Sequence, residues 1–139
     1  GILAVSAVPK YINLQADAKT ATLEGVKAAM QGASSLVYGK SIVAGNQKIP
    51  DSNTPQPTIT LTNGSVINTN FGYPVGESAD WNKLLELNAE DFKVSSVGGA
   101  RIAVHPASVI PFDETEACIV VYFQATVTNP PIIVVNPCL

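Results

Sequence analysis

Side chains that could carry out chemistry are few in this sequence of 139 residues. It contains two cysteines, Cys118 and Cys138, and a single histidine, His105. A cysteine and a histidine can form a nucleophile and base, but no third group that would orient them accompanies either residue. A zinc site needs several clustered cysteine or histidine ligands, which the sequence lacks. We therefore expect no catalytic residue, no metal site and no cofactor, and we do not expect an enzyme.

The two cysteines lie near the C-terminus, 20 residues apart. This spacing does not suit a metal site, and a disulfide is the simpler interpretation than a catalytic thiol. Disulfides persist in oxidising compartments, so the pair points to an exported protein. Closing a loop of this length is worth about 3 kcal/mol by the chain-entropy argument. We predict a Cys118–Cys138 disulfide.

Two further groups have a binding and a structural interpretation. Three aromatic residues that could stack on a sugar are Phe71, Tyr73 and Trp81. A lone tryptophan beside leucines is more often a core residue, and we expect Trp81 in the core. Three carboxylates that could bind calcium are Asp113, Glu114 and Glu116. They match no calcium loop, and we expect a solvated acidic turn.

The composition excludes some partners. Eight Lys and Arg against eleven Asp and Glu give a net charge of −3, so the chain lacks the basic surface of a nucleic-acid-binding protein. Charged residues make up 14% of the chain, against about 25% in typical soluble domains. The high apolar fraction, 46%, indicates a large partner surface.

Residues 1–45 have the pattern of a helix that ends at Gly45-Asn46. Apolar residues recur at the helical spacings of three, four and seven positions: Ile12, Ala16, Leu23, Val26, Met30, Ala33 and Val37. A second stripe contains small residues only: Ala18, Ala21, Gly25, Ala28 and Gly32. Small residues can allow close approach of another helix, or they can lie beneath the chain's own sheet. From Gly25 onward we expect them beneath the sheet.

Residues 46–139 are expected to form a loop, a short helix and an antiparallel sheet, so that residues 1–139 make one α+β domain. Asn63-Gly64 predicts a type I′ hairpin turn between strands at 58–62 and 66–67. Ser78 is expected to be the N-cap of a helix that reaches Leu87. Further strands are expected at 92–97, 101–104, 118–127 and 132–135.

The helix is too long to be covered by its own domain. From Pro9, which we expect to begin the ordered helix, to Ala44 it would measure about 54 Å at 1.5 Å per residue. A compact domain of this size has a diameter of about 37 Å. The N-terminal end should therefore protrude, and its apolar residues are Ile2, Leu3, Val5 and Val8. We expect this end to be buried in an assembly.

Residues 1–15 (GILAVSAVPKYINLQ) and 20–33 (TATLEGVKAAMQGA) resemble the N-terminal helix of type IV pilins, most closely the mannose-sensitive haemagglutinin pilins. The resemblance is specific to about residue 45. It implies the pilin fold, in which a long N-terminal helix packs on an antiparallel sheet. The methylated N-terminal residue of the family and the acidic residue near it would precede Gly1, so the chain resembles an N-terminally truncated pilin.

The resemblance also implies a function. The chain would be the structural subunit of a type IV pilus, a homopolymer built through the N-terminal helix, including Ile2, Leu3, Val5, Val8 and Pro9. Before assembly it would sit in the inner membrane with a periplasmic domain, and afterwards in an extracellular filament for adhesion, biofilm formation and motility. The filament would bind host or surface glycans. The alternatives are a pseudopilin of a type II secretion system, a minor pilin, and a carbohydrate-binding adhesin module.

Overall fold

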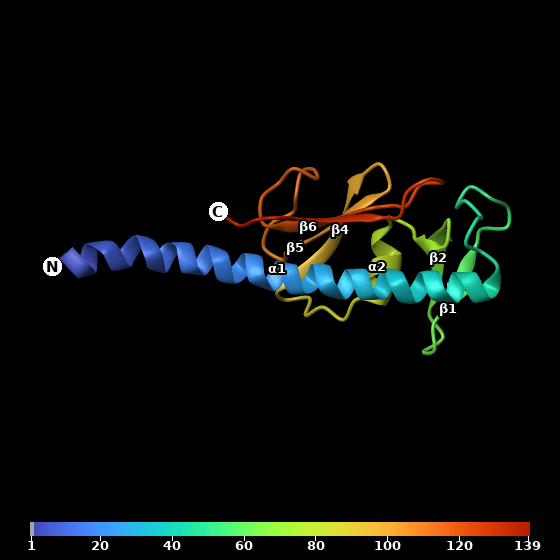
Figure 1. The fold of residues 1–139 in the computed structure, drawn as a ribbon, viewed down its shortest axis with the longest axis horizontal. Coiled ribbons are helices and arrows are strands. Elements are labelled where there is room, and N and C mark those ends of the chain that lie inside the picture. Colours follow the sequence, from blue (N-terminus) through green and yellow to red (C-terminus); the bar gives the residue numbers. More distant parts are fainter. Residues whose placement is uncertain (1) are drawn as a thin grey trace.

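A long helix lies beside two antiparallel sheets in the computed structural model, which describes the backbone of residues 2–139 and the side chains of residues 15–139 (Figure 1). Helix α1 runs Ile2–Ala44 and contains 43 residues, a length of about 65 Å. It begins before Pro9, so the prediction that Pro9 starts the helix is wrong. A proline inside a helix costs about 3 kcal/mol, but it removes only one of the many backbone hydrogen bonds of α1, and the helix continues on both sides of it.

The N-terminal part of α1 extends past both sheets, as the length comparison predicts (Figure 1). The predicted assembly residues Ile2, Leu3, Val5, Val8 and Pro9 belong to this part, and their side chains lie outside the described residues.

The other end of α1 stops where the sequence predicts. Gly45 has a φ of 76°, and its N–H donates to the Ile42 carbonyl at 3.1 Å. The N–H of Asn46 donates to the Ser41 carbonyl at 2.8 Å. These two bonds form a Schellman motif, which satisfies carbonyls at the end of the helix and requires a left-handed residue such as glycine.

The first sheet has the order β1-β2-β3, with β1 at Thr58–Thr60, β2 at Val66–Asn70 and β3 at Tyr73–Pro74. The predicted hairpin is present, but its turn is not type I′. The N–H of Gly64, whose φ is 89°, donates to the Leu61 carbonyl, and Leu61 N–H donates to the Ser65 carbonyl. This is a three-residue loop in which the Asn63 side chain accepts the Ser65 N–H, so Asn63 needs no left-handed conformation.

Helix α2 runs Ser78–Leu84, which is shorter than predicted. Its N-cap position is Glu77, in an extended conformation, so Ser78 is the first helical residue and not the cap. At the other end Leu85 is extended and buried in the core, and this packing ends the helix before Leu87.

The second sheet has the order β4-β5-β6-β7: Phe92–Gly98, Arg101–Pro106, Ile119–Phe123 and Ile132–Asn136. The chain thus has two antiparallel sheets where one was expected. Strand β6 ends at Phe123 and not at Val127. The next residue, Gln124, accepts the Gly76 N–H and donates to Asp51, so the chain leaves the ladder to contact the loops beside the first sheet.

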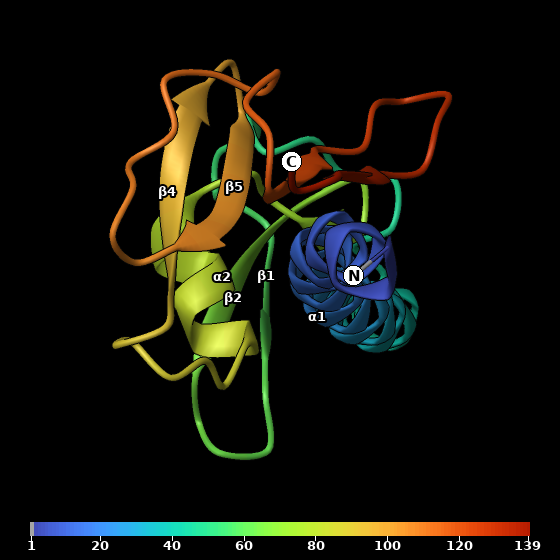
Figure 2. The same cartoon turned by 90° about the vertical axis from the view of Figure 1, so that its left-hand side faces the viewer.

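The sheets share α1 as one wall of the core. Leu23, Met30 and Val37, spaced by seven residues, are buried. The first two pack in a cluster with Trp81 and Tyr122, while Val37 packs against the first sheet. The predicted apolar stripe from Ala16 to Val37 is therefore confirmed as the inner face of α1. The strands lie to one side of the helix, and its other side faces away from them (Figure 2).

Candidate functional site

The outer face of α1 carries the small-residue stripe. Ala18, Ala21, Gly25, Ala28 and Gly32 are all exposed. The prediction that the stripe lies beneath the sheet from Gly25 onward is wrong. Leu23, Met30 and Val37 lie half a turn away on the helix, and burying these larger side chains removes far more apolar area from water. We call the five exposed residues the small-residue face.

Three glycines stand out along this side of the helix. Gly25, Gly32 and Gly39 are seven residues apart, and a Cβ atom added at any of them would meet nothing within 4 Å. Glycine in a helix interior costs about 1 kcal/mol relative to alanine. The packing of this chain offers no compensation, since each position has room for a side chain. The glycines therefore suit a contact with another molecule that comes close to the helix backbone.

Replacing the three glycines by alanine should stabilise the soluble domain. We expect the triple variant Gly25→Ala, Gly32→Ala, Gly39→Ala to raise the free energy of unfolding by about 2.5 kcal/mol, because each alanine restores helix propensity without a clash. Urea denaturation measures the change. The control Gly72→Ala should destabilise, since Gly72 has a φ of 85° and its Cβ would lie 2.9 Å from Tyr38 Cδ1. A triple variant that is less stable than the parent would show that the three glycines pack against the rest of the chain.

The Cys118–Cys138 disulfide is present, as predicted. The Cys118 N–H donates to the Asn136 carbonyl at 2.9 Å, which continues the pairing of β6 with β7. The Cys138 N–H donates to Thr20 Oγ1 on α1 at 3.0 Å. The bridge therefore holds the C-terminal segment against the helix.

His105 is buried in β5, and both of its ring nitrogens have partners. Nδ1 lies 2.8 Å from the Pro106 carbonyl, which can only accept, so Nδ1 carries the proton. Nε2 then accepts the hydroxyl of Ser95 at 2.7 Å. This geometry resembles a nucleophile and base, but the imidazole is 1% exposed and offers no space to a substrate. The pair fixes β4 to β5.

Trp81 does not join the other two predicted aromatic residues, Phe71 and Tyr73, which line one shallow pocket together with Tyr38. Trp81 is completely buried and packs on Tyr122 with ring centroids 4.6 Å apart, so it lies in the core as expected. The Tyr122 hydroxyl donates to the Pro74 carbonyl at 2.6 Å, and burial raises the pKa of this phenol strongly. Tyr73 instead stacks on Tyr38 at 4.3 Å. Partial burial raises the Tyr73 pKa, and the nearby Tyr38 raises it further.

Two carboxylates of the acidic turn, Asp113 and Glu114, bind groups of the chain itself. Oδ1 of Asp113 accepts the side-chain hydroxyl of Thr115 at 2.5 Å and its N–H at 2.8 Å, and these bonds lower the pKa of Asp113. Glu114 pairs with Arg101 at 2.6 Å. Within the described residues, no three histidine, cysteine or carboxylate side chains gather as a metal site would require.

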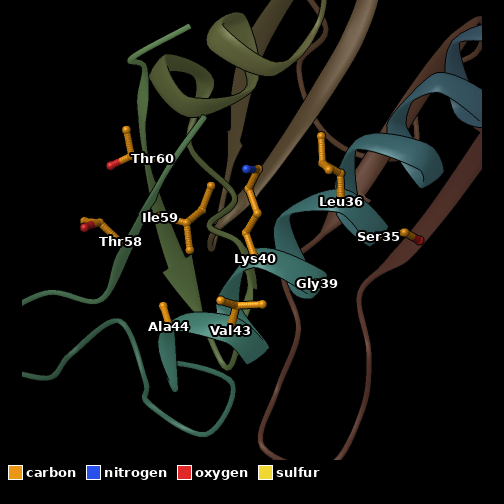
Figure 3. A pocket seen from close by; sticks show the side chains of 9 residues that line it. All are labelled: Ser35, Leu36, Gly39, Lys40, Val43, Ala44, Thr58, Ile59 and Thr60. Carbon is orange, nitrogen blue, oxygen red and sulfur yellow. The ribbon is translucent and has the colours of Figure 1, made fainter. Parts of the chain in front are cut away.

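A groove lies between the last turns of α1 and the edge strand β1 (Figure 3). Its residues are Ser35, Leu36, Gly39, Lys40, Val43, Ala44, Thr58, Ile59 and Thr60. Leu36 and Val43 are exposed there, while Ile59 is buried in the cluster beneath. This groove is not predicted from the sequence, because it depends on how β1 meets α1 and leaves no periodic signal. The one sequence signal is that the bulky residues Leu36 and Val43 follow the small-residue stripe on the same side of the helix.

No helix in the described part of the chain has both the length and the apolar character needed to cross a membrane. No protein-family model, no curated protein and no solved structure matches the chain.

Proposed function

We propose that this chain is the structural subunit of a type IV pilus, which polymerises through α1 into an extracellular filament. The observation that carries the proposal is the exposed row of Gly25, Gly32 and Gly39, each of which costs helix stability and has open space above it. A second helix packed on this face would bring its backbone close, as small residues allow. The cost in the free subunit would then be offset by packing in the filament.

The shape of α1 supports the same proposal. The helix exceeds the sheets in length, and its inner face is occupied by them only in the C-terminal part (Figure 1). The small-residue face lies opposite this inner face, so one helix can pack on its own sheets and on neighbouring helices at once. Of the two stretches that resemble a pilin helix, residues 1–15 belong to the part that extends beyond the sheets, and residues 20–33 belong to the part that packs on them. Such an arrangement makes helices the centre of the filament and sheets its surface.

The proposal includes a route of assembly. The subunit would wait in the inner membrane with its sheets in the periplasm, and join the filament from there. The Cys118–Cys138 bridge suits this oxidising compartment. It also favours a pilin over the pseudopilin of a type II secretion system, whose family more often stabilises the corresponding region with calcium. Adhesion, biofilm formation and motility would follow from the filament.

Filament assembly in cells tests the proposal. Gly32→Leu in the full-length protein should abolish or greatly reduce pili, because a leucine side chain would keep neighbouring helices apart. The same substitution should not lower the stability of the soluble domain, since its Cβ points into open space. Gly32→Ala serves as the matched small variant, and we expect it to retain more pili than Gly32→Leu. Normal pili from Gly32→Leu would contradict the proposed function of this face.

A further inference from the structure

Two apolar surfaces lie at opposite ends of the part of the molecule that contains the sheets. One is the groove between α1 and β1. The other is the loop between β5 and β6, residues 107–118, whose exposed apolar side chains are Val109, Ile110 and Phe112. Phe112 is 89% exposed. The loop, in orange, lies at the end where α1 leaves the sheets, and the groove lies beside the C-terminal end of α1 (Figure 1).

The charges at the two surfaces are opposite. Lys40 lines the groove and, within the described residues, forms no ion pair (Figure 3). Asp113 follows Phe112 in the loop, and Thr115 holds it through Oδ1 alone, which leaves Oδ2 open among the described residues. An aromatic side chain next to a carboxylate is thus presented at one end, and an apolar groove with a lysine at the other.

The groove also offers backbone groups. Ile59 faces Ile67 of β2. Pro57 and Leu61 form backbone hydrogen bonds across to β2, through Thr69 N–H to the Pro57 carbonyl and Leu61 N–H to the Ser65 carbonyl. In an antiparallel pair every second residue of a strand bonds to its neighbour, so residues 57, 59 and 61 are the ones that bond to β2. Thr58 and Thr60 therefore direct their N–H and C=O groups away from β2, toward the groove. The Thr58 carbonyl already accepts the Asn46 side chain at 2.8 Å. The Thr58 N–H and both groups of Thr60 have no partner among the described residues and can pair with an incoming peptide backbone, as in strand addition.

We propose that the β5–β6 loop of one copy of this chain docks into the α1–β1 groove of a second copy. Phe112 packs between Leu36 and Val43, and Asp113 lies beside Lys40. The contact joins two different surfaces, so it does not close on itself and can repeat along the direction of α1. It rests on the proposed filament function and assigns the surface contact between successive subunits. Gly39 belongs to both the glycine row and the groove, so the two contact surfaces are continuous.

Mixing two variants of the 139-residue chain tests the contact. The wild-type chain should self-associate weakly at high concentration in sedimentation velocity. Phe112→Asp and Val43→Asp should each weaken this association at least about tenfold, as loss of a central apolar anchor does. Both side chains are about 90% exposed, so both variants should remain folded. An equimolar mixture should form a dimer and nothing larger, because Phe112→Asp retains the groove and Val43→Asp retains the loop.

Charge reversal gives a second readout. Lys40→Glu and Asp113→Lys should each weaken the association, and their mixture should recover it. Lys93→Glu, an exposed charge change on β4, is the control and should have no effect. Variants that self-associate like wild type, or mixtures that stay monomeric, would overturn this inference while the Gly32→Leu result could still support the filament. Loop–groove dimers from a chain that forms no pili in cells even as wild type would contradict the proposed function alone.

Discussion

Replacing Met30 by aspartate should prevent the domain from folding, whereas replacing Val5 by aspartate should abolish filaments and leave the domain folded. Met30 is completely buried in the cluster with Leu23, Trp81 and Tyr122. Truncating a buried methionine alone costs about 2–5 kcal/mol. An unpaired carboxylate there adds a desolvation cost of several kcal/mol, against a total stability of about 5–15 kcal/mol for a domain. The near-ultraviolet circular dichroism and the cooperative urea transition of the variant should be lost.

Val5 belongs to the opposite end of α1, where the sequence predicts an assembly surface. Its side chain lies outside the described residues, so the expectation rests on the apolar pattern and on the extension of α1 beyond the sheets (Figure 1). A charge at this position would have to be buried between helices in the filament. Val5→Asp should therefore yield a normally folded domain and no pili, as counted by electron microscopy.

Two controls separate charge from position. Gln31→Asp places the same charge one residue after Met30, on an exposed position, and should leave folding nearly unchanged. Asn82→Asp adds the charge on the surface of α2 and should leave filaments in place. The division of α1 into a folding part and an assembly part would be wrong if Val5→Asp unfolded the soluble domain or still formed pili.

Removing the disulfide should lower the free energy of unfolding by about 3 kcal/mol. The bridge closes a loop of 20 residues that contains β6 and β7, and it holds the C-terminal segment where Cys138 bonds to Thr20. The double variant Cys118→Ser, Cys138→Ser should show this loss as a lower urea midpoint. Native and reduced proteins should differ in mass by two hydrogens.

A second double variant refines this result. Cys118 has a φ of 65°, a left-handed conformation that costs a non-glycine residue about 1–2 kcal/mol. Cys118→Gly, Cys138→Ser should therefore lose less stability than the serine version, because glycine adopts this conformation without strain. If the two double variants were equally unstable, the left-handed conformation of residue 118 would not affect the free energy of unfolding. If both matched the parent, the bridge would have no role in stability.

The sequence predicted the elements that depend on local pattern and strong residue signals. The α1 stripe has bulky residues at helical spacing, and three of them, Leu23, Met30 and Val37, are buried. Gly45-Asn46 marked the helix end correctly, because only a glycine readily adopts the left-handed C′ position. The two cysteines allowed only one intramolecular pairing.

Other features could not be predicted, since they depend on contacts between distant segments. The end of β6 is set by the bonds of Gln124 to Gly76 and Asp51. Two stripes of α1 could meet the sheets, and their spacing in the sequence does not decide between them. The prediction that the small-residue stripe meets the sheets from Gly25 onward is wrong for this reason. The α1–β1 groove arises only when β1 lies beside α1, 14 or more residues later in the chain.

Thiol labelling at position 28 tests most directly whether the outer face of α1 is the assembly surface. Ala28 is exposed in the small-residue face, and cysteine is small enough to replace it. In the soluble chain Ala28→Cys should react rapidly with iodoacetamide, as should the control Lys93→Cys on β4. In filaments of the full-length protein, we expect the position-28 thiol to react at least about tenfold more slowly, because only local opening would expose it. Equal rates in the soluble chain and in filaments, with the control unchanged, would contradict assembly through this face.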